Sequence, residues 1–136
     1  MNNGSIVGIG IDLVRISRVR EALGRWADRF LARVLSQDES TYCRTRIDPA
    51  PHVAARFAAK EAAMKALGIG WAGASWREFE VINMPSGQPA LRLSGRAAQR
   101  MATLGADTAF VSLTHDGDYA AAQVILSRGP ASFSTP

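Results

Sequence analysis

Two acidic residues in apolar surroundings are the first candidates for chemistry. Asp12 follows residues 5–11, a segment with the alternation of a strand. Gly8 and Gly10 share one face of that strand with Asp12 and leave room for a close approach to its backbone. Glu61 lies at the edge of the apolar stripe of a predicted helix. Because a charge is costly to desolvate when unpaired, each carboxylate needs a partner or a metal ion.

Basic residues lie close to Glu61 in the sequence. The only two lysines, Lys60 and Lys65, belong to the same predicted helix. Two converging carboxylates beside cationic side chains would form a site for Mg²⁺ and phosphate, because Mg²⁺ prefers hard oxygen ligands and leaves positions for substrate phosphates. Two alternatives need no metal. Glu61 and Lys65 can form an i,i+4 surface pair, and Asp12 can be a turn residue that closes its strand.

The two histidines differ in what they can do. His115 ends a predicted strand, where it can act as a general base because imidazole titrates near neutral pH. Alternatively, it is a turn residue bonded to Asp116 or Asp118. His52 stands near the start of the long predicted helix and is interpreted as a surface or capping side chain.

Cysteine usage and hydropathy exclude two classes of protein. The single cysteine, Cys43, has no activating neighbour and no partner within the chain for a disulfide, which fits a reducing compartment. No apolar run approaches the ~18 residues needed to span a bilayer. The first five residues have no basic residue, and no long apolar stretch follows them, unlike a secretory signal. We therefore expect a cytoplasmic protein with no membrane partner.

The positive charge lies in one half of the chain. The net charge is +4 with a sequence pI near 10.0, and 14 of the 16 basic residues are arginine. Residues 1–70 hold 11 basic and 7 acidic residues, whereas residues 71–136 hold five of each. Such a surplus indicates either a solvated surface or an anionic partner: nucleic acid, an acidic protein or a phosphorylated small molecule.

Length and periodicity predict a single domain over residues 1–127, followed by a Pro- and Ser-rich tail, 128–136, that we expect to be disordered. The expected class is α/β of the α+β type, with an antiparallel sheet packed against one long helix. Ser17, Ser36 and Ser94 are candidate helix N-caps, and Ser36 forms a capping box with Glu39. Strands are expected at 5–11, 78–83, 90–93, 108–115 and 119–126, and helices at 17–26, 28–35, 36–44, 51–67 and 94–105.

Three motifs resemble the holo-[acyl-carrier-protein] synthase family. The first is Ile9-Gly10-Ile11-Asp12-Leu13-Val14, with Arg18 six residues after the aspartate; the second, residues 56–68, is the most specific. The third is residues 111–115 followed by 119–124. Together they span nearly the whole chain, in order.

The resemblance implies a 4'-phosphopantetheinyl transferase with the fold of that family. Such enzymes move the 4'-phosphopantetheine arm of coenzyme A to a serine hydroxyl of an apo acyl carrier protein, with Mg²⁺, and release adenosine 3',5'-bisphosphate. The family is homotrimeric, with each active site between neighbouring subunits. Phosphoryl transfer needs positioning and charge neutralisation more than covalent help, so two acids, a metal and cations suffice.

The resemblance also implies roles for individual residues. Asp12 and Glu61 would hold the Mg²⁺, and with His115 they are the expected catalytic residues. The serine proton would go to a water on the ion, which we favour because the carboxylates hold that ion, or to Glu61 or His115. The expected coenzyme A contacts are Arg56, Lys60, Lys65, Gly68 and His115, and the expected docking residues for the acidic carrier protein are Arg18 and Arg25.

Two other functions use the same residues. A Mg²⁺-dependent pyrophosphate hydrolase acting on coenzyme A or nucleotides would release adenosine bisphosphate without any carrier protein. A basic nucleic-acid-binding module would show steeply salt-dependent binding to any duplex, and Asp12→Ala would leave that binding intact or tighten it. With the family resemblance, we expect the carrier protein and not a nucleic acid as the partner.

Overall fold

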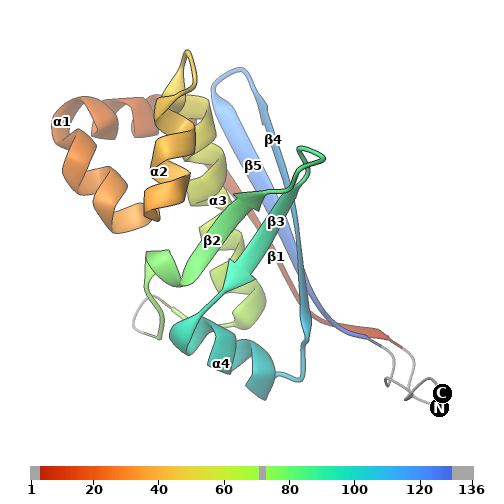
Figure 1. The fold of residues 1–136 in the computed structure, drawn as a ribbon. Helices are drawn as coiled ribbons and strands as arrows, with labels where there is room; N and C mark the ends of the chain where they lie inside the picture. The colour runs from red at the N-terminus through yellow and green to blue at the C-terminus, as the bar shows by residue number, and fades with distance from the viewer. Residues whose placement is uncertain (1–3, 71–72, 130–136) are drawn as a thin grey trace.

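The computed structural model describes residues 4–70 and 73–129 (Figure 1). Its elements follow one another in the order β1 (Ser5–Arg15), α1 (Ile16–Val34), α2 (Gln37–Arg44), α3 (Pro49–Leu67), η1 (Trp76–Glu78), β2 (Phe79–Asn83), β3 (Pro89–Leu93), α4 (Gly95–Thr103), β4 (Thr108–Asp116) and β5 (Tyr119–Arg128). In these described residues, no helix has the length and apolar character needed to cross a bilayer.

The strands form two antiparallel sheets. β1, β5 and β4 make a three-stranded sheet in that order, while β2 and β3 form a separate pair. Helix α3 packs against β1 and β5, and α1 and α2 gather around its beginning, as Figure 1 shows. The predicted α+β class with antiparallel strands and a long helix is therefore confirmed, with the strands divided between two sheets.

Two glycines set the distance between β1 and α3. A Cβ added to Gly8 would collide with the carbonyl oxygen of Ala66, and one added to Gly10 would collide with that of Ala62. Side chains on this face of β1 would thus keep the helix away. The close approach predicted for this strand face is the contact with α3, and Asp12 follows the glycines on the same face.

The helix ends show where local rules succeed and where tertiary contacts replace them. The capping box of Ser36 and Glu39 is present, and Gly68 ends α3 with φ of 69°. Ser17, however, is no cap: α1 begins at Ile16, and the Ser17 hydroxyl donates to Asp118 Oδ2 at 2.7 Å. Ser94 precedes α4 without a side-chain cap bond.

Helix α1 joins the two short helices that were predicted on either side of residue 27. The element is continuous from Ile16 to Val34, and Trp26 interrupts it with a non-helical backbone at φ −135° and ψ 38°. At the other end of the chain, β5 extends two residues further than predicted, so Arg128 belongs to the sheet and not to the tail. Residues 130–136 of the predicted tail lie outside the described residues.

Candidate active site

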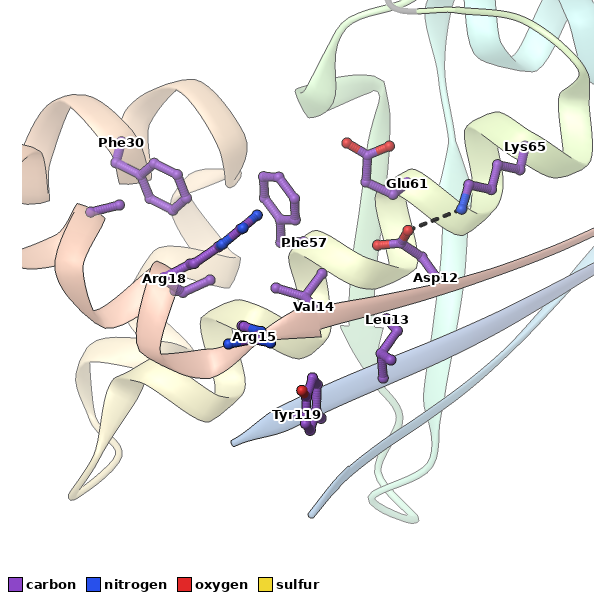
Figure 2. Close-up of a pocket in the computed structure, with 12 residues that line it drawn as sticks. Asp12, Leu13, Val14, Arg15, Arg18, Phe30, Phe57, Glu61, Lys65 and Tyr119 are labelled. Atoms are coloured by element: carbon purple, nitrogen blue, oxygen red, sulfur yellow. Dashed lines mark hydrogen bonds and ion pairs between the residues drawn. The ribbon is translucent and has the colours of Figure 1, made fainter. Parts of the chain in front are cut away.

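A pocket of about 750 Å³ opens between α1, β1 and α3. Asp12 enters it from β1, and Glu61 and Lys65 enter it from successive turns of α3 (Figure 2). The two carboxylates, far apart in sequence, therefore line one cavity. The glycines of β1 permit this meeting, because they let the strand carry Asp12 up to the helix that carries Glu61.

The Asp12 carboxylate has a cationic neighbour. Lys65 Nζ donates to Asp12 Oδ1 at 3.1 Å and to the carbonyl oxygen of Ile11 at 3.0 Å. The Asp12 side chain is only 16% exposed, whereas that of Lys65 is 55% exposed. Asp12 is thus held in place at the wall, and the lysine reaches it from solvent.

The donor set fits Mg²⁺. Asp12 and Glu61 are carboxylate residues that line the same pocket, and the described residues contain no group of three or more His, Cys, Asp and Glu that could hold a metal. Two carboxylates alone suit an ion that keeps several waters and binds through substrate phosphates. Zinc in structural sites, by contrast, demands four protein ligands.

The remaining walls of the pocket divide by character. Arg15 and Arg18 bring positive charge to the end formed by β1 and α1. Phe30 and Phe57 form an apolar side and stack on each other with ring centroids 6.2 Å apart. Phe57 also stacks on Trp76 at 4.7 Å, which holds its ring against the body of the protein.

Arg56 and His115 meet in a second place. Both line a smaller cleft of about 180 Å³ between α2, α3 and β4, with Tyr42 and His52. Neither residue lines the pocket that holds Asp12 and Glu61. Within one chain, the predicted site is therefore divided in two. We call the pocket of Asp12 and Glu61 the acidic pocket, and the cleft of Arg56 and His115 the cationic cleft.

The Arg56 side chain is buried at this cleft. Its guanidinium stacks over the Tyr42 ring, 4.4 Å from the centroid, and Nη1 donates to the carbonyl oxygen of His52 at 3.4 Å. Its Nε has no hydrogen-bond partner although it is buried. Arg46 stacks on the same tyrosine at 4.3 Å, so two guanidinium groups meet at one ring.

His52 also lines this cleft, whereas its position in the sequence predicts a surface or capping side chain. Its ring lies 6.2 Å from that of His115 and 6.0 Å from that of Tyr42. Burial, Arg56 and Arg46 lower the pKa of His52 below its ordinary value, which favours the neutral ring. The sequence does contain a signal for this position: His52 and Arg56 are four residues apart on one helix, so their side chains lie on the same face.

Three of the predicted contacts lie apart from the acidic pocket. The Lys60 side chain is fully buried and donates to Glu39 Oε1 at 2.7 Å and to the carbonyl oxygen of Trp76 at 3.1 Å. It is a structural residue of the core, and burial lowers its pKa. Gly68 is explained by its positive φ at the end of α3. Arg25 lies exposed on α1 and pairs with Glu21.

Cys43 is buried, and that burial raises the pKa of its thiol. A buried thiol that resists ionisation is a poor nucleophile, which agrees with its interpretation from the sequence as a small helical residue.

A sequence model of the 4'-phosphopantetheinyl transferase superfamily matches residues 8–124, which include Asp12, Glu61 and His115. The chain belongs to this superfamily. The family resemblance of the three motifs is thus confirmed, and so is the prediction that the chain is a phosphopantetheinyl transferase.

Individual relatives and solved structures of this family are similar to the chain over most of its length. The holo-[acyl-carrier-protein] synthase of Trichlorobacter lovleyi is 50% identical over 122 residues, which are 89% of this chain and 97% of that protein. That of Koribacter versatilis is 44% identical over 122 residues, 89% of this chain and 98% of that protein. The crystal structure of the Helicobacter pylori holo-[acyl-carrier-protein] synthase in complex with coenzyme A superimposes with a TM-score of 0.77 at 31% identity, covering 87% of this chain and 98% of that one.

Proposed function

We propose that this chain transfers the 4'-phosphopantetheine arm of coenzyme A to a serine hydroxyl of an apo acyl carrier protein, with Mg²⁺, and releases adenosine 3',5'-bisphosphate. The observation that carries the proposal is the meeting of Asp12, Glu61 and Lys65 in one pocket of a chain from this family. The likeness to a coenzyme A-bound relative supports the choice of donor.

The reaction needs charge neutralised at a diphosphate and the attacking oxygen held in line with the breaking bond. Asp12 and Glu61 would hold Mg²⁺, which neutralises the diphosphate charge when bound. Lys65 would contact phosphate oxygens, because it already lies at this pocket. The nucleophile comes from the carrier protein, so the enzyme needs no nucleophilic side chain of its own.

Arg56 and His115 would bind the other end of coenzyme A. A coenzyme with an adenosine bisphosphate end carries charge far from its pantetheine arm. The cleft offers the Arg56 guanidinium and the Tyr42 ring, and Arg46 stacks on the same ring. Its distance from the acidic pocket requires an explanation, since one coenzyme must reach both.

We propose a homotrimer in which the acidic pocket of one subunit faces the cationic cleft of the next. The support is an uncovered apolar face of the three-stranded sheet. Ile9, Ile11 and Leu13 of β1 are 59%, 64% and 65% exposed, and Phe110 of β4 is 57% exposed. Ile9 and Phe110 both pair with Ile125 of β5, so they form one row across the sheet. Exposed apolar surfaces of this kind mark interfaces between chains.

Helix α1 would receive the carrier protein. Arg18 lines the acidic pocket and Arg25 lies exposed further along the same helix. An acidic partner guided by these charges would deliver its serine to the pocket beside them. We place the reaction in the cytoplasm, where a protein with a single reduced cysteine is stable.

The deciding experiment is a mass spectrum of apo acyl carrier protein after incubation with coenzyme A, Mg²⁺ and this chain. We expect a mass increase of one phosphopantetheine arm and release of adenosine 3',5'-bisphosphate only when the carrier is present. Release without a carrier would instead establish the pyrophosphate hydrolase. A carrier whose serine is replaced by alanine is the matched control.

The shared site has its own test, in which Asp12→Ala and Arg56→Ala chains are unfolded, mixed and refolded together. Each variant alone is expected to be inactive. If one site combines Asp12 from one subunit with Arg56 from its neighbour, random assembly of the two chains restores about a quarter of the wild-type sites. A mixture as inactive as its components would show that both residues act within one subunit.

A further inference from the structure

The ammonium group of Lys65 lies beside the Asp12 carboxylate, where the proposed Mg²⁺ would also bind. Lys65 Nζ lies 3.1 Å from Asp12 Oδ1 and 3.0 Å from the carbonyl oxygen of Ile11, and Figure 2 draws this contact within the pocket. The proposed function assigns Asp12 to Mg²⁺ and Lys65 to phosphate. Each assignment gives one member of this pair a second charged partner, although the pair already neutralises the charge of both side chains.

The ammonium and a divalent ion would compete for the negative charge of this carboxylate. A Mg²⁺ ligand lies 2.0–2.1 Å from its ion, so an ion on Asp12 Oδ1 would be within about 5 Å of an ammonium that keeps its present position. Two cations at that distance repel strongly in a partly enclosed site. Binding of the ion to Asp12 therefore weakens the attraction between Asp12 and Lys65 and favours displacement of the lysine.

Lys65 is built to move. Its side chain is more than half exposed, lies in the last turn of α3 and reaches Asp12 with the end of a flexible stem. The phosphate oxygens of a bound diphosphate would offer it a new acceptor in the same pocket. The other lysine of the helix, Lys60, has no such freedom, because it is fully buried among its acceptors.

We propose that Lys65 is the resident counter-ion of Asp12 in the free enzyme, and that it competes with the divalent cation until a diphosphate takes it over. This inference rests on the proposed function and adds to it a coupling. The metal should bind weakly to the free chain and tightly with the coenzyme, and each ligand should strengthen binding of the other by the same factor.

The test measures Mn²⁺ binding to the free protein by the paramagnetic resonance signal of unbound Mn²⁺, with no coenzyme and no turnover. We expect Lys65→Met to bind Mn²⁺ about tenfold more tightly than wild type, and Lys65→Arg to stay close to wild type. Arg15→Gln removes a positive charge from the same pocket without touching the pair and is the matched control. Asp12→Asn in the Lys65→Met background should abolish the gain.

Unchanged Mn²⁺ affinity in Lys65→Met would overturn the inference, as would an equal gain in Arg15→Gln, which would reveal only the general field of the pocket. Circular dichroism verifies that each variant is folded, and Lys65→Gln provides a second neutral variant. Saturating coenzyme A should then tighten Mn²⁺ binding more in wild type than in Lys65→Met, after correction for Mn²⁺ bound by coenzyme in solution.

The two proposals fail separately. A gain in Mn²⁺ affinity without any arm transfer to a carrier supports the competition at Asp12 and contradicts the proposed function. Arm transfer with unchanged Mn²⁺ affinity in Lys65→Met supports the function and contradicts the competition.

Discussion

Helix α3 carries both lysines of the chain, five positions apart, and each pairs with a carboxylate from another element. Lys60 donates to Glu39 of α2, and both side chains are completely buried. Lys65 donates to Asp12 of β1 at the edge of an open pocket. The two pairs contain the same kinds of charge, and they differ in what surrounds them.

The surroundings decide what each pair can do. Glu39 accepts from Lys60 and also from the backbone N–H groups of Ser36 and Val81, so this pair joins α2, α3 and β2 at one point. Because both side chains are completely buried, neither is accessible to a ligand from solvent. The Asp12–Lys65 pair keeps solvent on one side, so its partners can be exchanged. The buried Lys60–Glu39 pair therefore has a structural role, whereas the partly exposed Lys65–Asp12 pair remains accessible to ligands.

The largest effect is expected from the open pair. Asp12→Ala or Glu61→Ala should lower kcat/KM for arm transfer by roughly a thousandfold, because loss of one organised electrostatic contact to the transition state costs about 10²–10³ in rate. The free energy of unfolding should change by less than about 1 kcal/mol, since a partly exposed ion pair contributes little. Carrier-modification kinetics and urea unfolding measure the two quantities. Normal activity in both variants would contradict the metal assignment.

The buried pair should show the opposite behaviour. Lys60→Met leaves the Glu39 carboxylate buried without its cation, which should lower the free energy of unfolding by about 3–5 kcal/mol. The folded fraction should keep its kcat within a fewfold. Urea unfolding at one fixed protein concentration measures the loss, because subunit association contributes to stability.

The control for the buried pair is Lys65→Met, which should cost less than about 1 kcal/mol of stability. Equal losses in the two lysine variants would remove the distinction between the pairs. The double variant Glu39→Gln with Lys60→Met should recover only part of the loss, since Glu39 also accepts from the Val81 N–H.

Much of the acidic pocket was predictable because its signals are local. Gly8 and Gly10 clear one face of a strand, Asp12 follows on that face, and Glu61 lies at the border of an apolar stripe. Each of these facts depends only on the period of a strand or a helix. The capping box of Ser36 was predictable for the same reason, and the structure confirms it.

The rest depended on packing between distant segments. Nothing in the spacing of Glu39 and Lys60 indicates that they pair, because their contact exists only once α2 lies on α3. Arg56 and His115 were expected at one coenzyme site with Lys65, yet the fold of a single chain places them in another cleft with Tyr42. The division of five strands into two sheets likewise follows from long-range pairing.

Arg18 is a third cation to compare with the two lysines. It lines the acidic pocket but belongs to neither lysine–carboxylate pair. Arg18→Glu should raise KM for the carrier protein by about tenfold and leave KM for coenzyme A nearly unchanged, because it reverses a charge on the face proposed to meet an acidic partner. Steady-state kinetics with each substrate varied in turn measure the split. Equal effects on both KM values would count against docking and would place Arg18 among the coenzyme contacts. Arg33→Glu, on the last turn of the same helix, is the matched charge reversal.

The smallest effect is expected at Glu80, a shielded carboxylate that does not line the acidic pocket. The Glu80 side chain is 15% exposed, as shielded as that of Asp12, but it accepts from the Ser36 hydroxyl at 2.6 Å and pairs with Arg92 outside the acidic pocket. The hydrogen bond from Ser36 and the charge of Arg92 lower the pKa of this carboxyl, against the opposing effect of burial.

Because the folded protein holds the Glu80 proton less tightly than the unfolded chain, this carboxylate stabilises the fold above the ordinary carboxyl pKa. The contribution disappears as the pH falls through the lowered value. Glu80→Gln should therefore be less stable than wild type at pH 7 by under about 1 kcal/mol, and the difference should shrink in acid. Its rate of arm transfer should match wild type. A rate loss like that of Asp12→Ala would show that shielding of a carboxylate, and not its place in the pocket, explains the effect at Asp12.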